Sequence, residues 1–262
     1  MLWHIPSLPK PLCAEHNNRP KWESDMSTDR EVALLHSMID RAGKLTQELK
    51  TIYDRDLSNK EVSAEALNLT HEIIEKCSNS LDQSMSLLFE RSIKPHLTDL
   101  PKKGGYFPAG KDEHAYKSTL GQWNASDLQN IAPEIDDRLR SLQPFTASRN
   151  AIYAQIKAFA AHKHTGLRPQ TRNEQRRVNV TRPGQGGVSW GPGVKFGQGV
   201  HVMGVPINPA TQMPAHSEGI NIDVEVWVSF LIEETGQNAL DFCNAAIGAA
   251  RAAIEALHPP TA

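Results

Sequence analysis

Residues 220–233 read INIDVEVWVSFLIE, and apolar and polar side chains alternate along almost all of this stretch. Successive side chains of an extended strand point to opposite faces, so the alternation predicts a strand with one apolar face. Such a strand is typical of an antiparallel sheet that has one face covered and the other in water. We therefore expect the even-numbered side chains to be buried, namely Ile222, Val224, Val226, Val228, Phe230 and Ile232.

The sequence around this strand predicts a small, mostly antiparallel sheet followed by a helix. Residues 237–257 are rich in alanine and carry an apolar stripe at helical spacing, and we expect this helix to pack across the sheet. Short strand signals alternate with glycine-rich turns upstream, the signals at 178–181, 194–196 and 200–205 and the turns at 184–187 and 191–193.

The first half of the chain is dominated by helical periodicity. Apolar residues recur at three- and four-residue steps in four segments, with polar N-cap residues or prolines at their ends. Two successive helical hairpins of this kind predict a four-helix bundle. The predicted helices run from 27 or 28 to 54–59, from 63 to 95, from 126 to 144 with a kink or a new start at Pro133, and from 148 to 164; residues 97–124 are predicted to be irregular.

These patterns together predict an α+β protein. Residues 1–26 contain four prolines and no apolar period, and we expect an extended N-terminal arm with Met26 as an alternative start. Residues 27–165 form the predicted four-helix bundle. Residues 166–262 form the β-rich segment, with the long strand at 220–233 and the closing helix at 237–257.

Composition excludes several classes of protein. The formal net charge of the 262-residue chain is -2, so no global positive field would attract nucleic acid. The chain has no apolar run long enough to span a membrane, and its N-terminus lacks the apolar core of a secretion signal. Three distant cysteines are typical of a reducing compartment, so we expect a cytoplasmic protein.

Motifs for common cofactors and catalytic centres are missing from the sequence. The glycine runs at 184–187 and 191–193 are not followed by the Lys-Ser/Thr pair of a phosphate-binding loop. Cys77 lies on an apolar helical stripe and is predicted to be a core residue. His162 and His164 are two residues apart and would not share a helical face, so we predict no metal site and no cofactor.

Three short motifs resemble those of an uncharacterised family of bacterial proteins. The motifs are Ser80-Leu81-Asp82, Tyr106-Phe107-Pro108, and Leu142-Gln143-Pro144-Phe145 followed by Lys163-His164. The resemblance covers roughly residues 30–258 and implies the same order of helices, β segment and closing helix. It also implies that Asp82, Lys163 and His164 meet in one polar binding cluster between helices.

A second resemblance concerns Arg91 and His96. Their spacing is similar to the arginine–histidine motif of HEPN ribonucleases, which are also helical bundles. In that case His96 would act as a general base on a ribose hydroxyl and Arg91 would hold the phosphate. The alternative is that both are cationic residues at a helix C-terminus, where the helix dipole favours positive charge.

Several arginines cluster between residues 168 and 182, where acidic residues are scarce. Such a cluster can bind phosphate or RNA, but no aromatic side chains for base stacking accompany it. We interpret the stretch as a solvated linker, with nucleic-acid binding as the alternative. The residues that would carry this binding are Arg168, Arg172, Arg176 and Arg177.

Two functions of different classes are compatible with these features. The first is a non-catalytic binding or interaction module that contacts another protein or forms a homodimer. The second is a HEPN-like ribonuclease of a toxin or defence system. The lack of a well-spaced catalytic constellation favours the first.

Overall fold

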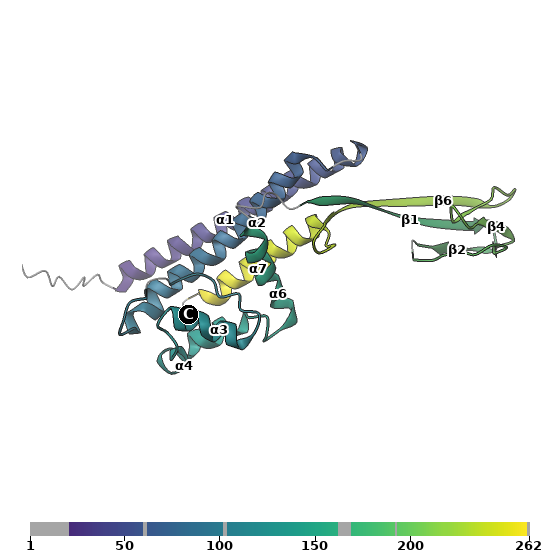
Figure 1. Ribbon diagram of the computed structural model, residues 1–262. Helices are drawn as coiled ribbons and strands as arrows, with labels where there is room; N and C mark the ends of the chain where they lie inside the picture. Colours follow the sequence, from purple (N-terminus) through teal and green to yellow (C-terminus); the bar gives the residue numbers. More distant parts are fainter. Residues whose placement is uncertain (1–20, 60–61, 102–103, 162–168, 192, 261–262) are drawn as a thin grey trace, which may run out of the picture.

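The computed structural model describes residues 21–59, 62–101, 104–161, 169–191 and 193–260 (Figure 1). A body of helices occupies one end of the molecule and a long β-arm extends from it. The fold class is α+β, as the sequence predicts.

Four helices form most of the helical body. The helices α1 (Lys21–Asn59) and α2 (Ala64–Leu88) pack along each other, and α7 (Ala239–Leu257) lies against both. The shorter α6 (Ala151–Ala160) contacts α2 and α7. The small side chains on α7 allow close approach to its neighbours, and the buried ones are Ala239, Ala246, Ala250 and Ala253.

Some helices begin at the predicted residue and others do not. The hydroxyl of Ser63 caps α2 by accepting the N–H of Ala66, as predicted. The helix α1 begins at Lys21, earlier than the predicted start at 27 or 28, because no proline or glycine interrupts residues 21–28. The side chain of Asn238 caps α7 by accepting the N–H groups of Leu240 and Asp241.

Short helices close the body at the end away from the arm. They include α3 (Glu113–Gln122) within the stretch predicted to be irregular, because Asp112 caps it through the N–H of Ala115. The predicted third helix is divided into α4 (Leu128–Ile131) and α5 (Pro133–Ser141), with Pro133 in the first turn of α5. The remaining helical turns are η1 (Phe89–Ile93), η2 (Lys94–His96) and η3 (Ser148–Asn150), the last of which leads into α6.

The β-arm is built on two long antiparallel strands. The strand β1 (Gln170–Arg182) pairs with β6 (Asn221–Ile232) from Gln170 opposite Ile232 to Thr181 opposite Asn221. The strand β2 (Gly186–Trp190) pairs only with the far half of β1. A second small sheet of β3 (His201–Val202), β4 (Val205–Asn208) and β5 (Met213–Pro214) completes the tip of the arm.

Each end of the arm is covered by its own apolar contacts. At the base, Phe230 and Ile232 join the core of the helical body, and the ring of Tyr53 packs on Phe230 with a centroid distance of 4.4 Å. The tip has a separate apolar cluster centred on Val178, Val180, Trp190, Val205, Ile207 and Ile220.

Three expectations about this segment are wrong. The arginine-rich stretch is the strand β1 rather than a solvated linker. The last helix belongs to the helical body and does not cross the sheet, because its apolar stripe matches the stripes of α1 and α2. Val224 and Val226, expected in a core, are 37% and 50% exposed, because neither the body nor the tip reaches the middle of the arm.

Candidate functional site

Two of the motifs that suggest a family resemblance are in contact, through Asp82 and Phe107, and a third, through Gln143, holds the same loop. A carboxylate oxygen of Asp82 accepts the backbone N–H of Phe107 at 3.0 Å, and the carboxylate also pairs with the ammonium of Lys157. The buried side chain of Gln143 accepts the N–H of Gly110 at 3.2 Å and donates to the carbonyl of Leu139. These contacts attach residues 104–110 to the helices.

The loop also packs closely against the helix that follows it, since a Cβ atom on Gly110 would lie 2.8 Å from the backbone nitrogen of Tyr116. Because the contacts of Asp82 with Phe107 and Lys157 hold this loop, we interpret Asp82 as a structural residue. Lys163 and His164, its expected partners in a binding cluster, lie outside the described residues, and so does His162.

A buried polar network that sequence reasoning missed lies beside this loop. The hydroxyl of Tyr116 donates to Asp136 at 2.7 Å, and Arg140 donates to the other oxygen of Asp136 at 2.7 Å. Burial and the neighbouring carboxylate of Asp136 raise the pKa of Tyr116. The spacing of Asp136 and Arg140 by one helical turn was the available signal. Because Tyr116, Asp136 and Arg140 each have a hydrogen-bond partner within the network, we interpret the network as structural.

A second polar cluster joins the arm to the body. The hydroxyl of Tyr53 donates to the side-chain oxygen of Gln170, and the amide nitrogen of Gln170 donates to Thr70 at 3.1 Å. Burial raises the pKa of Tyr53, so its hydroxyl stays protonated. These contacts fix the first residue of β1 between α1 and α2.

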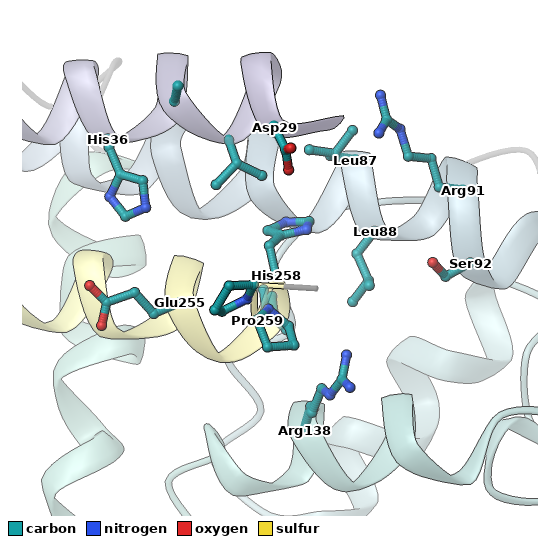
Figure 2. A pocket seen from close by; sticks show the side chains of 14 residues that line it. Asp29, His36, Leu87, Leu88, Arg91, Ser92, Arg138, Glu255, His258 and Pro259 are labelled. Atoms are coloured by element: carbon teal, nitrogen blue, oxygen red, sulfur yellow. The ribbon is translucent and has the colours of Figure 1, made fainter. Parts of the chain in front are cut away.

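A cavity of about 770 Å³ with ionisable side chains in its lining lies at the end of the helical body (Figure 2). It lies where α1 begins, where α2 passes into η1, and where α7 ends. Figure 2 shows His258 and Pro259 near its centre, between His36 and Glu255 on one side and Arg91 on the other. Its remaining lining includes Asp29, Val32, Leu87, Leu88, Ser92, Arg138 and Leu257.

His258 is the most constrained ionisable group in the cavity. Its Nε2 atom lies 3.0 Å from the carbonyl oxygen of Ser84 and 3.1 Å from the hydroxyl of the same residue. A carbonyl oxygen only accepts, so Nε2 carries the proton and Nδ1 is the basic atom of the neutral ring. Burial lowers the pKa of His258, and the charges of Arg91, Arg138 and His36 lower it further, although the bond to Ser84 raises it.

The proposed ribonuclease pair is divided between different surroundings. Arg91 lies in η1, forms an ion pair with Glu31 and lines the cavity. His96 ends η2, is exposed, and is not among the residues that line the cavity. The structure thus brings Arg91 close to His258 and Arg138.

The arginines of β1 are partly neutralised by neighbours. Arg172 and Arg176 both donate to Glu174 at 2.9 Å, and these bonds lower the pKa of Glu174. On the opposite face, Arg177 stands across from Glu225 of β6. Arg168 lies outside the described residues. The described arginines of β1 therefore alternate with or stand opposite acidic residues, so this part of the arm carries mixed charge.

One long edge of the arm has no partner strand among the described residues. In the sheet order β2-β1-β6, the strand β6 is an outer strand, and its outer side is met only at its base, where Leu231 forms an isolated antiparallel bridge with Asn238. Figure 1 shows β6 running from the helical body to the tip beside β1. Its middle residues Val224 and Val226 are also exposed on their face of the sheet.

Other candidate chemistry is absent from the described residues. Cys77 and Cys243 are buried, and burial raises the pKa of the Cys77 thiol to about 12, so this thiol is not a nucleophile near neutrality. Within the described ranges, no three His, Cys, Asp or Glu residues gather in a way that could hold a metal ion. No helix among them is both long and apolar enough to cross a membrane.

Comparisons with known proteins identify no relative: no family model, no curated protein and no solved structure matches this chain.

Proposed function

We propose that this protein is a non-catalytic interaction module whose β-arm is the contact element and whose partner is a second copy of the same chain. The observation that carries the proposal is the outer edge of β6, a strand of 12 residues that has no neighbouring strand on that side among the described residues and only an isolated bridge from Leu231 to Asn238 at its base. An unpaired edge offers a row of N–H and C=O groups to an added strand.

The edge of β6 lacks most features that prevent strand pairing. Natural edge strands are commonly interrupted by proline, lysine or a bulge. Residues 221–232 contain no proline, lysine or glycine, and their pairing with β1 runs without a break. A two-stranded ribbon in water is only marginally stable, so the middle of the arm gains from additional strands.

The sequence of β6 is compatible with antiparallel pairing to itself. In a register centred on Val226, that residue faces its own copy, and Val224 faces Val228 of the second copy. On the other face, Asp223 falls opposite Ser229 and Glu225 opposite position 227, so no two carboxylates stand directly opposite each other. Two arms would then form a four-stranded sheet with a continuous valine strip on one face.

The alternative function, a HEPN-like ribonuclease, has no specific observation in its favour. Its candidate residues Arg91 and His96 do not line one cavity, and Arg91 already pairs with Glu31. The mixed charge of β1 likewise gives no support to nucleic acid as the partner.

The mass of the purified chain in solution tests the proposal. We expect a dimer by sedimentation analysis, and we expect Val226→Lys to dissociate it because two ammonium groups would face each other at the centre of the new sheet. Val188→Lys is the matched control, since Val188 is 45% exposed on β2 and away from the β6 edge.

Two results would contradict this function. A wild-type chain that is monomeric at every concentration, or a dimer that survives Val226→Lys and dissociates with Val188→Lys, would exclude pairing through β6. Capture of an unrelated protein by a monomeric chain would replace the second copy with that protein.

A further inference from the structure

We propose that the cavity at the end of the helical body is a binding site for a small organic anion with an apolar tail, with Arg138 and His258 as the groups that contact the anionic head. This inference is independent of the β-arm, because the cavity is lined by α1, α2, η1, α5 and the end of α7.

The distribution of charge in the cavity favours an anion. The basic side chains Arg91, Arg138, His36 and His258 are half-buried, and all four charges or potential charges act on the same region. The acidic lining residues Asp29 and Glu255 are exposed, as is Glu31, which pairs with Arg91. Half-buried positive groups whose counter-charges lie in water make the interior of the cavity favourable to a negative group.

Within the described residues, the guanidinium of Arg138 has N–H donors that make no hydrogen bond. Its ion-pair partner there is Glu134, at 3.8 Å, which is beyond hydrogen-bond distance, and the side chain of Glu134 is 88% exposed. A guanidinium with free donors in a half-buried position is the usual protein partner of a carboxylate or phosphate. Figure 2 shows Arg138 directed toward the region of His258 and Pro259.

The apolar lining residues favour a ligand that also has a hydrocarbon part. Leu88 and Leu257 form a buried floor, Val32 and Leu87 are half-buried, and Pro259 adds an exposed ring. A cavity of about 770 Å³ lies within the range of sites for small organic ligands. An inorganic ion would leave most of this apolar surface in water, so we assign an anion with a hydrocarbon part.

His258 gives the site a measurable signature. Its neutral ring is held by Ser84, with Nδ1 as the basic atom. The groups that surround it are Arg91, Arg138, His36, Asp29 and Glu255. An anion bound beside Arg138 would offset the positive charges that lower the pKa of His258, so binding near neutral pH would take up protons.

Calorimetric titration with three probes of eight carbon atoms each tests the proposal. The probes are octanoate, octyl phosphate and the uncharged octanamide. We expect binding of at least one anion and at least about tenfold weaker binding of octanamide, since a charge-assisted hydrogen bond is lost. Binding of octanoate alone or octyl phosphate alone would identify the head group, and either result supports the site.

Variants distinguish specific binding from adsorption. We expect Arg138→Gln to weaken binding of the anion about tenfold or more, and Arg251→Gln to leave it unchanged, because Arg251 pairs with Asp40 and does not line the cavity. No binding of either anion to the wild type, equal binding of octanamide, or equal effects of the two variants would overturn the proposal.

The role of His258 has its own readout. Titration of octanoate in two buffers of different ionisation enthalpy measures proton uptake, and octanoate itself stays ionised near neutrality. We expect uptake in the wild type and in His71→Gln, because His71 lies near Glu75 and does not line the cavity, and none in His258→Gln. Uptake that persists in His258→Gln would overturn the contact between His258 and the anion, while the Arg138 comparison would still test the site.

Discussion

The helical body and the β-arm differ in how far their apolar residues are covered by other elements. In the body, four helices cover one another, and buried polar groups such as Asp136 and Gln143 have hydrogen-bond partners. In the arm, the middle of β1 and β6 has solvent on both faces and an open edge. This difference is the basis of our proposal that the body is a scaffold and that the arm pairs with a second copy of the chain.

The largest expected effect contrasts one aliphatic residue from each region. Leu49 is fully buried between helices, whereas Val226 is 50% exposed. Leu49→Ala should lower the free energy of unfolding by about 2–5 kcal/mol, since it removes buried methyl groups and leaves a cavity. Val226→Ala should change it by less than about 0.5 kcal/mol in the monomer. Denaturant unfolding at low protein concentration measures both, and equal losses would show that the middle of the arm is covered.

An intermediate effect concerns Asp82, which the sequence marks as a binding residue and the structure places as an anchor for the loop. Asp82→Ala should cost about 1–3 kcal/mol because the N–H of Phe107 loses its acceptor and Lys157 loses its counter-charge.

The matched variant Asp82→Asn separates these two contributions. Its amide oxygen still accepts from Phe107, so we expect a smaller loss, mainly the half-exposed ion pair, which contributes at most about 1 kcal/mol. Thermal unfolding of the two variants provides the comparison. Stability unchanged in Asp82→Ala would argue against the structural role and return Asp82 to the binding residues.

The sequence predicts local structure well where one period dominates. The alternation at 220–233 locates β6 within one residue at each end, and Ser63 is an N-cap as expected. Alternation, however, states which side chains share a face and not whether another element covers that face. For the same reason the alanine stripe of α7 predicts close packing without naming its partners.

The candidate sites were less accessible to sequence reasoning. The cavity brings together side chains from four separate parts of the chain, and no spacing connects them before the fold is known; they are His36, Arg91, Arg138 and His258. The sequence draws attention to Arg91 through its spacing from His96, whereas in the structure Arg91 pairs with Glu31 and lines the cavity. Which edges of β1 and β6 are paired also depends on strand order, which hydrophobic periodicity does not encode.

The smallest expected effect is a pH dependence that belongs to the body and not to the arm. Burial lowers the pKa of His258 in the folded chain below its ordinary value of 6.5. The unfolded chain therefore binds more protons than the folded chain as pH falls below 6.5, and linkage requires that stability then decreases. Above that value both forms are neutral and the contribution of His258 is constant.

We expect the melting temperature to fall between about pH 7.5 and about pH 5.5, and we expect His258→Gln to reduce this fall even if it is less stable throughout. Val188→Lys, a change in the arm, should leave the slope as it is in the wild type. An identical slope in His258→Gln would mean that other groups titrate in this range and that the burial of His258 does not govern the acid sensitivity of the body.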